Sequence, residues 1–227
     1  MELILFNSLM ILSGGLMSKL LTKVVTASQL EFTIMMVNIT VLVVGISGAT
    51  QSEMPILMLV SIVVGSLIGS KLEIDEQFQK LGRYIENKIG GKKQGFGRAF
   101  ILMTMIHCVG SMAILGPLNL GLTGDNTILL IKSVLDFISA LVYGSIYGLG
   151  VIGSALVVLV YQGAIYLLSS SISSFLSPAV VVEIGAVGSV LVIALALHLL
   201  EIKEIKVANG LPAILVVVLY QVVLYLW

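Results

Sequence analysis

This chain of 227 residues contains few charged residues. Only 11% of the residues are charged and 58% are hydrophobic, with a mean hydropathy of +1.13. Too few charges are present to coat a soluble globule, and the apolar runs are long enough to cross a bilayer, which takes roughly 20 residues. The formal net charge is zero, which gives no reason to expect a nucleic-acid or acidic partner. The composition therefore predicts a polytopic integral membrane protein.

Residues that support metal, redox and hydrolytic chemistry are equally scarce. A single cysteine, Cys108, excludes an intrachain disulfide and a cysteine-based metal cluster. His107 and Cys108 are adjacent, so on a helix they point about 100° apart and cannot share a metal. His198 stands alone near an expected helix end. No HExxH, GxSxG or GxGD motif occurs. We therefore expect no metal site, no cofactor and no enzymatic activity, and a buried, hydrogen-bonded His107.

Apolar segments of spanning length predict an all-α transmembrane bundle, one domain over residues 1–227, with about eight spans. The first lacks the basic flank of a cleaved signal peptide, so we expect it to be retained. Glycines near residue 148 are expected to break the uncharged stretch 137–182 into two helices. The expected spans are 3–21, 32–50, 55–71, 99–118, 126–147, 151–170, 180–200 and 207–227, with 72–98 as the long loop.

The distribution of basic residues predicts the orientation. Seven of the twelve lie at 71–98, and four more are Lys19, Lys23, Lys203 and Lys206. Basic loops face the cytoplasm, so the loop 71–98 is expected to be cytoplasmic and both termini external in the cell membrane. Within that loop, apolar residues at spacings of three and four predict an amphipathic helix, which we interpret as lying on the inner leaflet; docking of a partner is the alternative. They are Ile74, Phe78, Leu81, Ile85 and Ile89.

The ionisable residues in the expected fifth span are the main functional candidates. Lys132 and Asp136 are four residues apart and so adjacent on a helix, and Asp125, seven residues before Lys132, is expected near the same face. An unpaired charge at mid-membrane costs about 3 kcal/mol, so such residues face water, a ligand or each other. Asp136 would bind or titrate the coupled ion, with Lys132 as counter-ion and with Ser133 and Asn119 as further ligands. The alternatives are a structural Lys132–Asp136 pair, and Asp125 as a helix cap.

Glycine and proline residues occur at the end of the expected fourth span. The pair Gly116–Pro117 allows either a broken helix that offers backbone groups to a solute, or an ordinary outer loop. Small residues also recur every four positions, at Ser61, Gly65 and Gly69, and at Ala140, Gly144 and Gly148. Such ridges permit close helix packing, within the bundle or in a homodimer.

Two sets of three spans resemble each other. Segment 29–49 aligns with 181–200, segment 6–21 with 161–176, and segment 54–64 with 211–221. The alignment pairs Glu31 with Glu183 and Asn7 with Gln162, and we interpret these four as gating or symmetry-related positions. Five spans separate the copies, so they would have opposite orientations, which is the inverted repeat of many secondary transporters. The helix macrodipole alone also explains acids in first turns.

Several segments resemble the bacterial integral-membrane family called domain of unknown function 554. They are CVGSMAILGPLNLGLTGD (108–125), LLIKSVLDFISA (129–140), VLVYQGAIYLL (158–168) and the stretch from 180 to 213. The resemblance implies a multi-span inner-membrane protein and no known activity. Family members commonly have Pro where Ser111 stands and Gln-Asp where Asn119 and Leu120 stand, so a role of that Asp does not transfer here.

The sequence thus favours a transporter or channel-like carrier of a small ion or solute in contact with the lipid bilayer. The alternative is a non-transporting scaffold or regulatory protein whose charges form a structural ion pair.

Overall fold

All the regular secondary structure in the residues that the structure describes is helical. The computed structural model describes residues 1–227 except 90–94, 109–110, 172–176 and 227. The helices are α1 (Glu2–Val24), α2 (Ala27–Ala49), α3 (Pro55–Lys71), α4 (Ile74–Ile89), α5 (Phe96–Cys108), α6 (Ser111–Thr123), α7 (Thr127–Tyr147), η1 (Gly148–Ile152), α8 (Gly153–Leu167), α10 (Pro178–Leu199), η2 (Val207–Gly210) and α11 (Pro212–Leu226).

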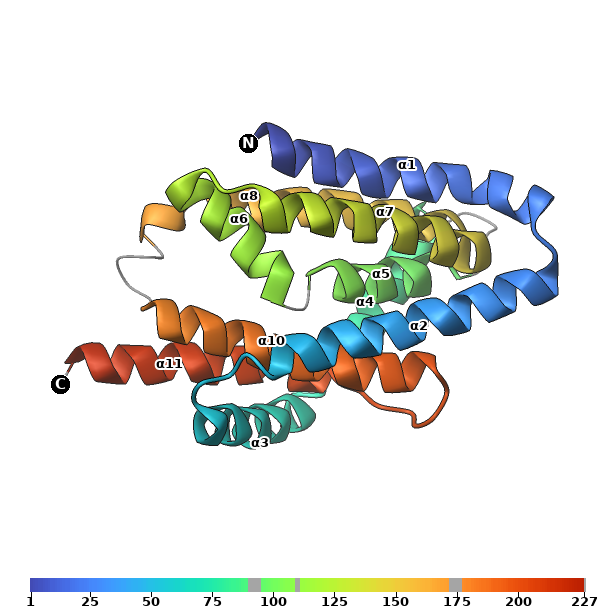
Figure 1. Ribbon diagram of the computed structural model, residues 1–227. Coiled ribbons are helices and arrows are strands. Elements are labelled where there is room, and N and C mark those ends of the chain that lie inside the picture. The colour runs from blue at the N-terminus through green and yellow to red at the C-terminus, as the bar shows by residue number, and fades with distance from the viewer. Residues whose placement is uncertain (90–94, 109–110, 172–176, 227) are drawn as a thin grey trace.

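Helices α1, α7 and α8 form one part of the bundle. Figure 1 shows α1 lying along α7, with both running in the same direction. Their backbones approach closely because Gly14 faces the Phe137 carbonyl and Gly144 faces Ser18. The chain then reverses at Gly148, whose positive φ of 78° favours glycine. This is where the sequence predicted a break, and α8 runs back along α1.

Helices α2, α3, α10 and α11 form the other part, packed as antiparallel pairs. At one end of the α2–α10 pair, Asn38 donates to the Leu199 carbonyl. In the α3–α11 pair, Gly65 lies against Ala213. Figure 1 shows α2 beside α10, and the two termini toward the same end of the bundle. Packing inside the chain thus accounts for both small-residue ridges of the sequence.

Helix length and apolar character support a multi-pass membrane protein. Four helical segments are long and apolar enough to cross a membrane: Glu2–Val24, Ser28–Ala49, Thr127–Leu167 and Pro178–Leu199. The count rises to six if two bent pairs, α3 with α4 and α5 with α6, each act as one span. The described structure therefore contains four to six candidate spans by this criterion.

The expected fourth span, 99–118, differs from the prediction. It consists of α5 and α6, whose axes are inclined by 53°, and α6 continues to Thr123. Gly116 and Pro117 both lie inside α6, so the structure has neither a helix break nor the start of an outer loop at this pair. Proline removes one backbone hydrogen bond, which membrane helices tolerate when their neighbours provide other partners.

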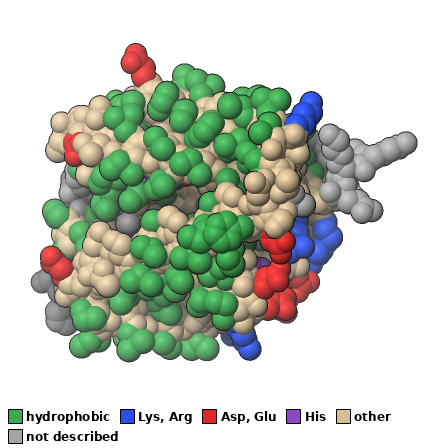
Figure 2. All heavy atoms as spheres, turned by 45° about the vertical axis from the view of Figure 1, so that its right-hand side comes forward, with side chains coloured by type: hydrophobic (Ala, Val, Ile, Leu, Met, Phe, Trp, Pro, Cys, Tyr) green, Lys and Arg blue, Asp and Glu red, His purple; other side chains and the backbone are tan. Residues whose placement is uncertain are grey.

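The surface matches a lipid environment. Large apolar side chains are exposed along the flanks, among them Ile56 and Leu156. Figure 2 shows hydrophobic side chains spread over the face in view, while the Lys and Arg side chains and several acidic ones gather toward the right and other acidic side chains lie at the left. An exposed apolar surface of this extent marks contact with lipid or another protein.

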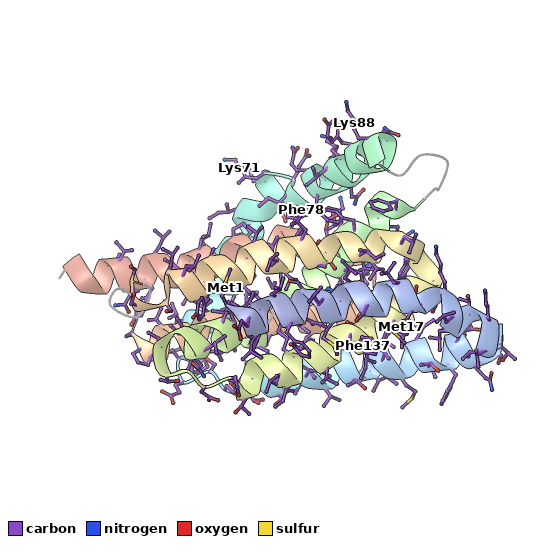
Figure 3. All side chains as sticks on the ribbon, turned by 90° about the horizontal axis from the view of Figure 1, so that it is seen from above. Met1, Met17, Lys71, Phe78, Lys88 and Phe137 are labelled. Atoms are coloured by element: carbon purple, nitrogen blue, oxygen red, sulfur yellow. The ribbon has the colours of Figure 1, made fainter. Side chains whose placement is uncertain are left out.

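Helix α4 confirms the predicted amphipathic helix. Its side chains Ile74 and Phe78 pack against an apolar cluster that includes Met105 and Leu191. The backbone N–H of Asp75 donates to Asn209 Oδ1 at 2.9 Å and ties α4 to η2. Figure 3 shows α4 along the edge of the bundle, with Phe78 toward the other helices and Lys88 away from them. The side chains of Ile85 and Ile89 lie outside the described residues.

Candidate functional site

The charged pair predicted on the fifth span is buried in the bundle. Lys132 Nζ donates to Asp136 Oδ1 and Oδ2 at 2.7 and 2.6 Å. The two residues are 5% and 4% exposed. Both lie on α7, and the spacing of four residues brings their side chains together on its buried face. A buried pair with bidentate geometry is held tightly, because either charge alone would be uncompensated.

Two amides from other helices complete the surroundings of the Asp136 carboxylate. Asn7 Nδ2 on α1 donates to Asp136 Oδ2 at 3.1 Å and to Gln162 Oε1 on α8 at 2.9 Å. Asn7 and Gln162 are fully buried. Among the described residues, Asn7 Oδ1 and Gln162 Nε2 have no hydrogen-bond partner. The amide pair therefore retains the Asn7 carbonyl oxygen as an acceptor and the two N–H groups of Gln162 Nε2 as donors.

A cavity of about 320 Å³ lies against the other side of the charged pair. It is bounded by α2, α5, α6, α7 and α10, and both Lys132 and Asp136 line it. Three hydroxyl residues, Thr40, Ser139 and Ser189, also line it, and the rest of the wall is apolar except for Gly45. The carboxylate of Asp136 thus stands between the Asn7–Gln162 amides and a space large enough for a small solute.

Asp125 does not join this pair. It precedes the first residue of α7 and is exposed, so the expectation that it shares their helical face is wrong. Its Oδ1 accepts the backbone N–H of Thr127 at 3.0 Å. That hydrogen bond lowers the pKa of the Asp125 carboxyl, because it stabilises the charged form. Asp125 thus accepts a free N–H at the start of α7, but the N-cap is Asn126, so the expectation that Asp125 is the N-cap is wrong by one residue.

The two other predicted ligands are also separate from the cavity lining. Ser133 is buried, but its hydroxyl donates to the Leu129 carbonyl within α7. Asn119 is half-buried on α6, and its backbone carbonyl accepts from Thr123. Neither residue is among those that line the cavity beside Lys132.

The two acids paired by the sequence alignment have different surroundings. Glu183 is fully buried, and its Oε2 accepts from Ser52 Oγ at 2.7 Å. Its Oε1 accepts the backbone N–H groups of Glu53 and Met54 at 2.7 and 2.9 Å. The carboxylate therefore holds the α2–α3 turn at the start of α3. Glu31, by contrast, is exposed near the start of α2.

A second polar cluster beside the pair was only partly foreseen. His107 is fully buried and hydrogen-bonded, as predicted, with Nδ1 2.9 Å from Ser154 Oγ and Nε2 2.9 Å from Ser139 Oγ. Ser139 also donates to the Asp136 carbonyl, which links His107 to the charged turn of α7. Sequence offered no signal for these partners, because they come from helices distant along the chain.

Another buried hydrogen bond ties α2 to α7. The Tyr143 hydroxyl donates to Asn38 Oδ1.

Within the part of the chain that the structure describes, no three His, Cys, Asp or Glu side chains come together in a way that could hold a metal ion. The polar groups of the site are therefore amides, hydroxyls, one imidazole and one ion pair.

Comparison with known proteins places this site in an uncharacterised family. Residues 4–222 match the family described as "Protein of unknown function (DUF554)". The chain is similar to "Uncharacterized membrane protein YdfK" of Bacillus subtilis (strain 168), with 32% identity over 93% of this chain and 92% of that protein. It is also similar to "Uncharacterized protein YqgA" of Escherichia coli (strain K12), with 28% identity over 70% of this chain and 69% of that protein. No solved structure matches the chain.

Proposed function

The chain belongs to the membrane-protein family of unknown function DUF554, and we propose that it is a secondary transporter or channel-like carrier of a small ion or solute. The observation that carries this proposal is the cavity lined by Lys132 and Asp136 on a helix of spanning length. Charges inside a membrane bundle are costly and are retained where they serve a pathway or a binding site. Asp136 is the residue that binds the solute or its coupled ion, and Lys132 is its counter-charge.

The proposed topology has eight crossings of the cytoplasmic membrane, with both termini outside. It counts α7 and α8 separately, since the chain reverses at Gly148, and takes α5 with α6 as one broken span. The α1–α2 turn and the segment that follows α10 lie toward one end of the bundle in Figure 1. Lys19 and Lys23 lie in the last part of α1 just before that turn, and Lys203 and Lys206 lie in the segment after α10, so with the loop 71–98 these regions would form the cytoplasmic side.

An inverted repeat is part of the same proposal. The segments aligned in the sequence fall on α1 and the end of α8, on α2 and α10, and on α3 and α11; residues 172–176 of the segment 161–176 lie outside the described residues. Each of these pairs is in contact, and the aligned residues Asn7 and Gln162 are hydrogen-bonded to each other. A two-fold axis in the membrane plane would produce such contacts between matched helices. Asn7 and Gln162 would then act as a gate beside Asp136.

A scaffold or regulatory function is the second candidate. It is favoured by the geometry of the pair, since Lys132 already satisfies both carboxylate oxygens of Asp136. In that case the ion pair would be purely structural, and α4, with its exposed Leu81 and Tyr84, would be the docking element.

Solute uptake by purified protein in liposomes separates the two candidates. Wild type, Asp136→Asn and the exposed control Asp125→Asn would be screened with a panel of simple ions and small metabolites. The transporter proposal expects uptake of at least one solute by wild type and by Asp125→Asn, and loss of uptake in Asp136→Asn. Equal uptake by all three would refute the site, and no uptake of any solute would favour the scaffold.

A further inference from the structure

The charge of the cavity wall restricts what it can bind. Among the described residues that line it, the ionisable side chains are Lys132 and Asp136, whose charges cancel. A single monovalent ion would add a net charge to this neutral wall, which is unfavourable in a low-dielectric interior unless a counter-charge enters with it. A solute with one positive and one negative group keeps the site neutral and pairs with both side chains.

The hydroxyl groups of the wall are arranged as acceptors. Thr40 donates to the Met36 carbonyl and Ser189 donates to the Gly185 carbonyl, each within its own helix. Each hydroxyl has a single hydrogen, so the capacity that remains on these oxygens is to accept. Together with the Asp136 carboxylate they suit a ligand group with several N–H donors, such as a primary ammonium. The one strong donor on the wall is the Lys132 ammonium, which suits a carboxylate.

The remainder of the wall is aliphatic. Its side chains include Val37, Val41, Val44, Leu135 and Val192. A volume of about 320 Å³ is at the lower end of small-molecule sites and leaves room for a compact apolar group beside the charged end. One polar, doubly charged end and one aliphatic end describe an amino acid with an aliphatic side chain.

We propose that this cavity binds a small aliphatic amino acid in its zwitterionic form. The ligand carboxylate pairs with Lys132, and the ligand ammonium pairs with Asp136 and the hydroxyl oxygens of Thr40 and Ser189. The existing ion pair opens to admit the ligand, and Asn7 keeps its hydrogen bond to Asp136 and so holds the carboxylate in place. This inference rests on the proposed transport function, whose substrate class it specifies.

Binding of radiolabelled L-leucine to the protein in nanodiscs tests the inference with matched analogues. The competitor 3-methylbutylamine keeps the ammonium and the side chain but lacks the carboxylate, and 4-methylpentanoate keeps the carboxylate and lacks the ammonium. L-leucine is expected to bind, and each analogue is expected to compete at least about tenfold more weakly because it leaves one wall charge without its partner. Equal or better competition by either singly charged analogue would overturn the inference.

Variants that keep the ion pair make the test independent of folding defects. Val44→Phe reduces the aliphatic room and is expected to shift the preference from leucine toward alanine. Thr40→Val removes one acceptor at nearly constant volume and is expected to weaken leucine binding severalfold. Unchanged leucine affinity in both variants would place any bound leucine elsewhere and overturn the inference.

The failures of the two proposals are distinguishable. If leucine does not bind but a simple ion is taken up in a manner that depends on Asp136, the transporter proposal stands and the amino-acid inference is wrong. If no solute is taken up and Asp136→Asn matches wild type in every assay, both are wrong.

Discussion

The buried pair Lys132–Asp136 predicts a large, non-additive effect on stability. Lys132 and Asp136 are 5% and 4% exposed, so Asp136→Asn would leave the Lys132 ammonium buried without a charged partner, and Lys132→Met would leave the Asp136 carboxylate in the same position. Removal of one member of a buried ion pair costs about 3–5 kcal/mol, because the other charge stays uncompensated. Replacement of both members by neutral residues of similar volume is often close to neutral. We therefore expect each single variant to be far less stable than the double variant.

A double-mutant cycle measures this directly. The free energy of unfolding would be determined by denaturant titration of wild type, both single variants and the double variant in the same bicelles. The double variant is expected within about 1–2 kcal/mol of wild type, which gives a coupling energy of about 4 kcal/mol or more. Single variants that each cost less than about 1 kcal/mol, the range of solvent-exposed pairs, would refute the burial on which this reasoning depends.

Three further predictions concern helix contacts and caps. Gly69→Ala should destabilise the fold by about 1–3 kcal/mol, because the added methyl group would collide with the Asn209 carbonyl. Gly116→Ala is the control and should be neutral or stabilising in the same unfolding assay, because a methyl group there makes ordinary van der Waals contacts. Glu183→Gln should lower stability by about 1–3 kcal/mol through weaker acceptance of the turn N–H groups, and a change below about 0.5 kcal/mol would contradict the role assigned to this carboxylate. Because the pKa of Asp125 is lowered in the folded protein, its carboxylate stabilises the fold above the unfolded pKa, and this stabilisation is lost as the pH falls through the folded pKa. The difference in stability between wild type and Asp125→Ala should therefore shrink in acid. Parallel pH profiles of the two proteins would show that the contact is absent in solution.

The sequence predicted those structural features that depend on the spacing of nearby residues. The amphipathic helix α4, the reversal at Gly148 and the contact between Lys132 and Asp136 follow from residues a few positions apart. The position of the bend in the broken span did not follow from such a pattern, because Pro117 lies inside α6 although proline usually interrupts helices. Membrane helices relax that rule, because neighbouring groups satisfy the freed backbone carbonyl.

Contacts between helices that are distant along the chain could not be predicted from the sequence. Glu31 and Glu183 occupy similar positions in the alignment, yet only Glu183 is buried and holds a neighbouring turn. The serine partners of His107 come from α7 and α8, and no spacing rule connects them to α5. Asp125 was misplaced because α7 begins at Thr127, one residue later than the expected start at 126, so Asp125 lies outside the helix and off its buried face.

Reaction of a cysteine placed in the cavity tests the central claim most directly. In a Cys108→Ala background, Ser189→Cys would line the cavity, and Ser61→Cys would be equally buried but outside its lining. A small, charged, membrane-impermeant thiol reagent should modify the cysteine at 189 and leave that at 61 unmodified, because the transport proposal requires water to reach the cavity that Ser189 lines and Ser61 does not. Equal protection of both cysteines, from either side of the membrane, would show that no solute reaches Lys132 and Asp136 and would contradict the account.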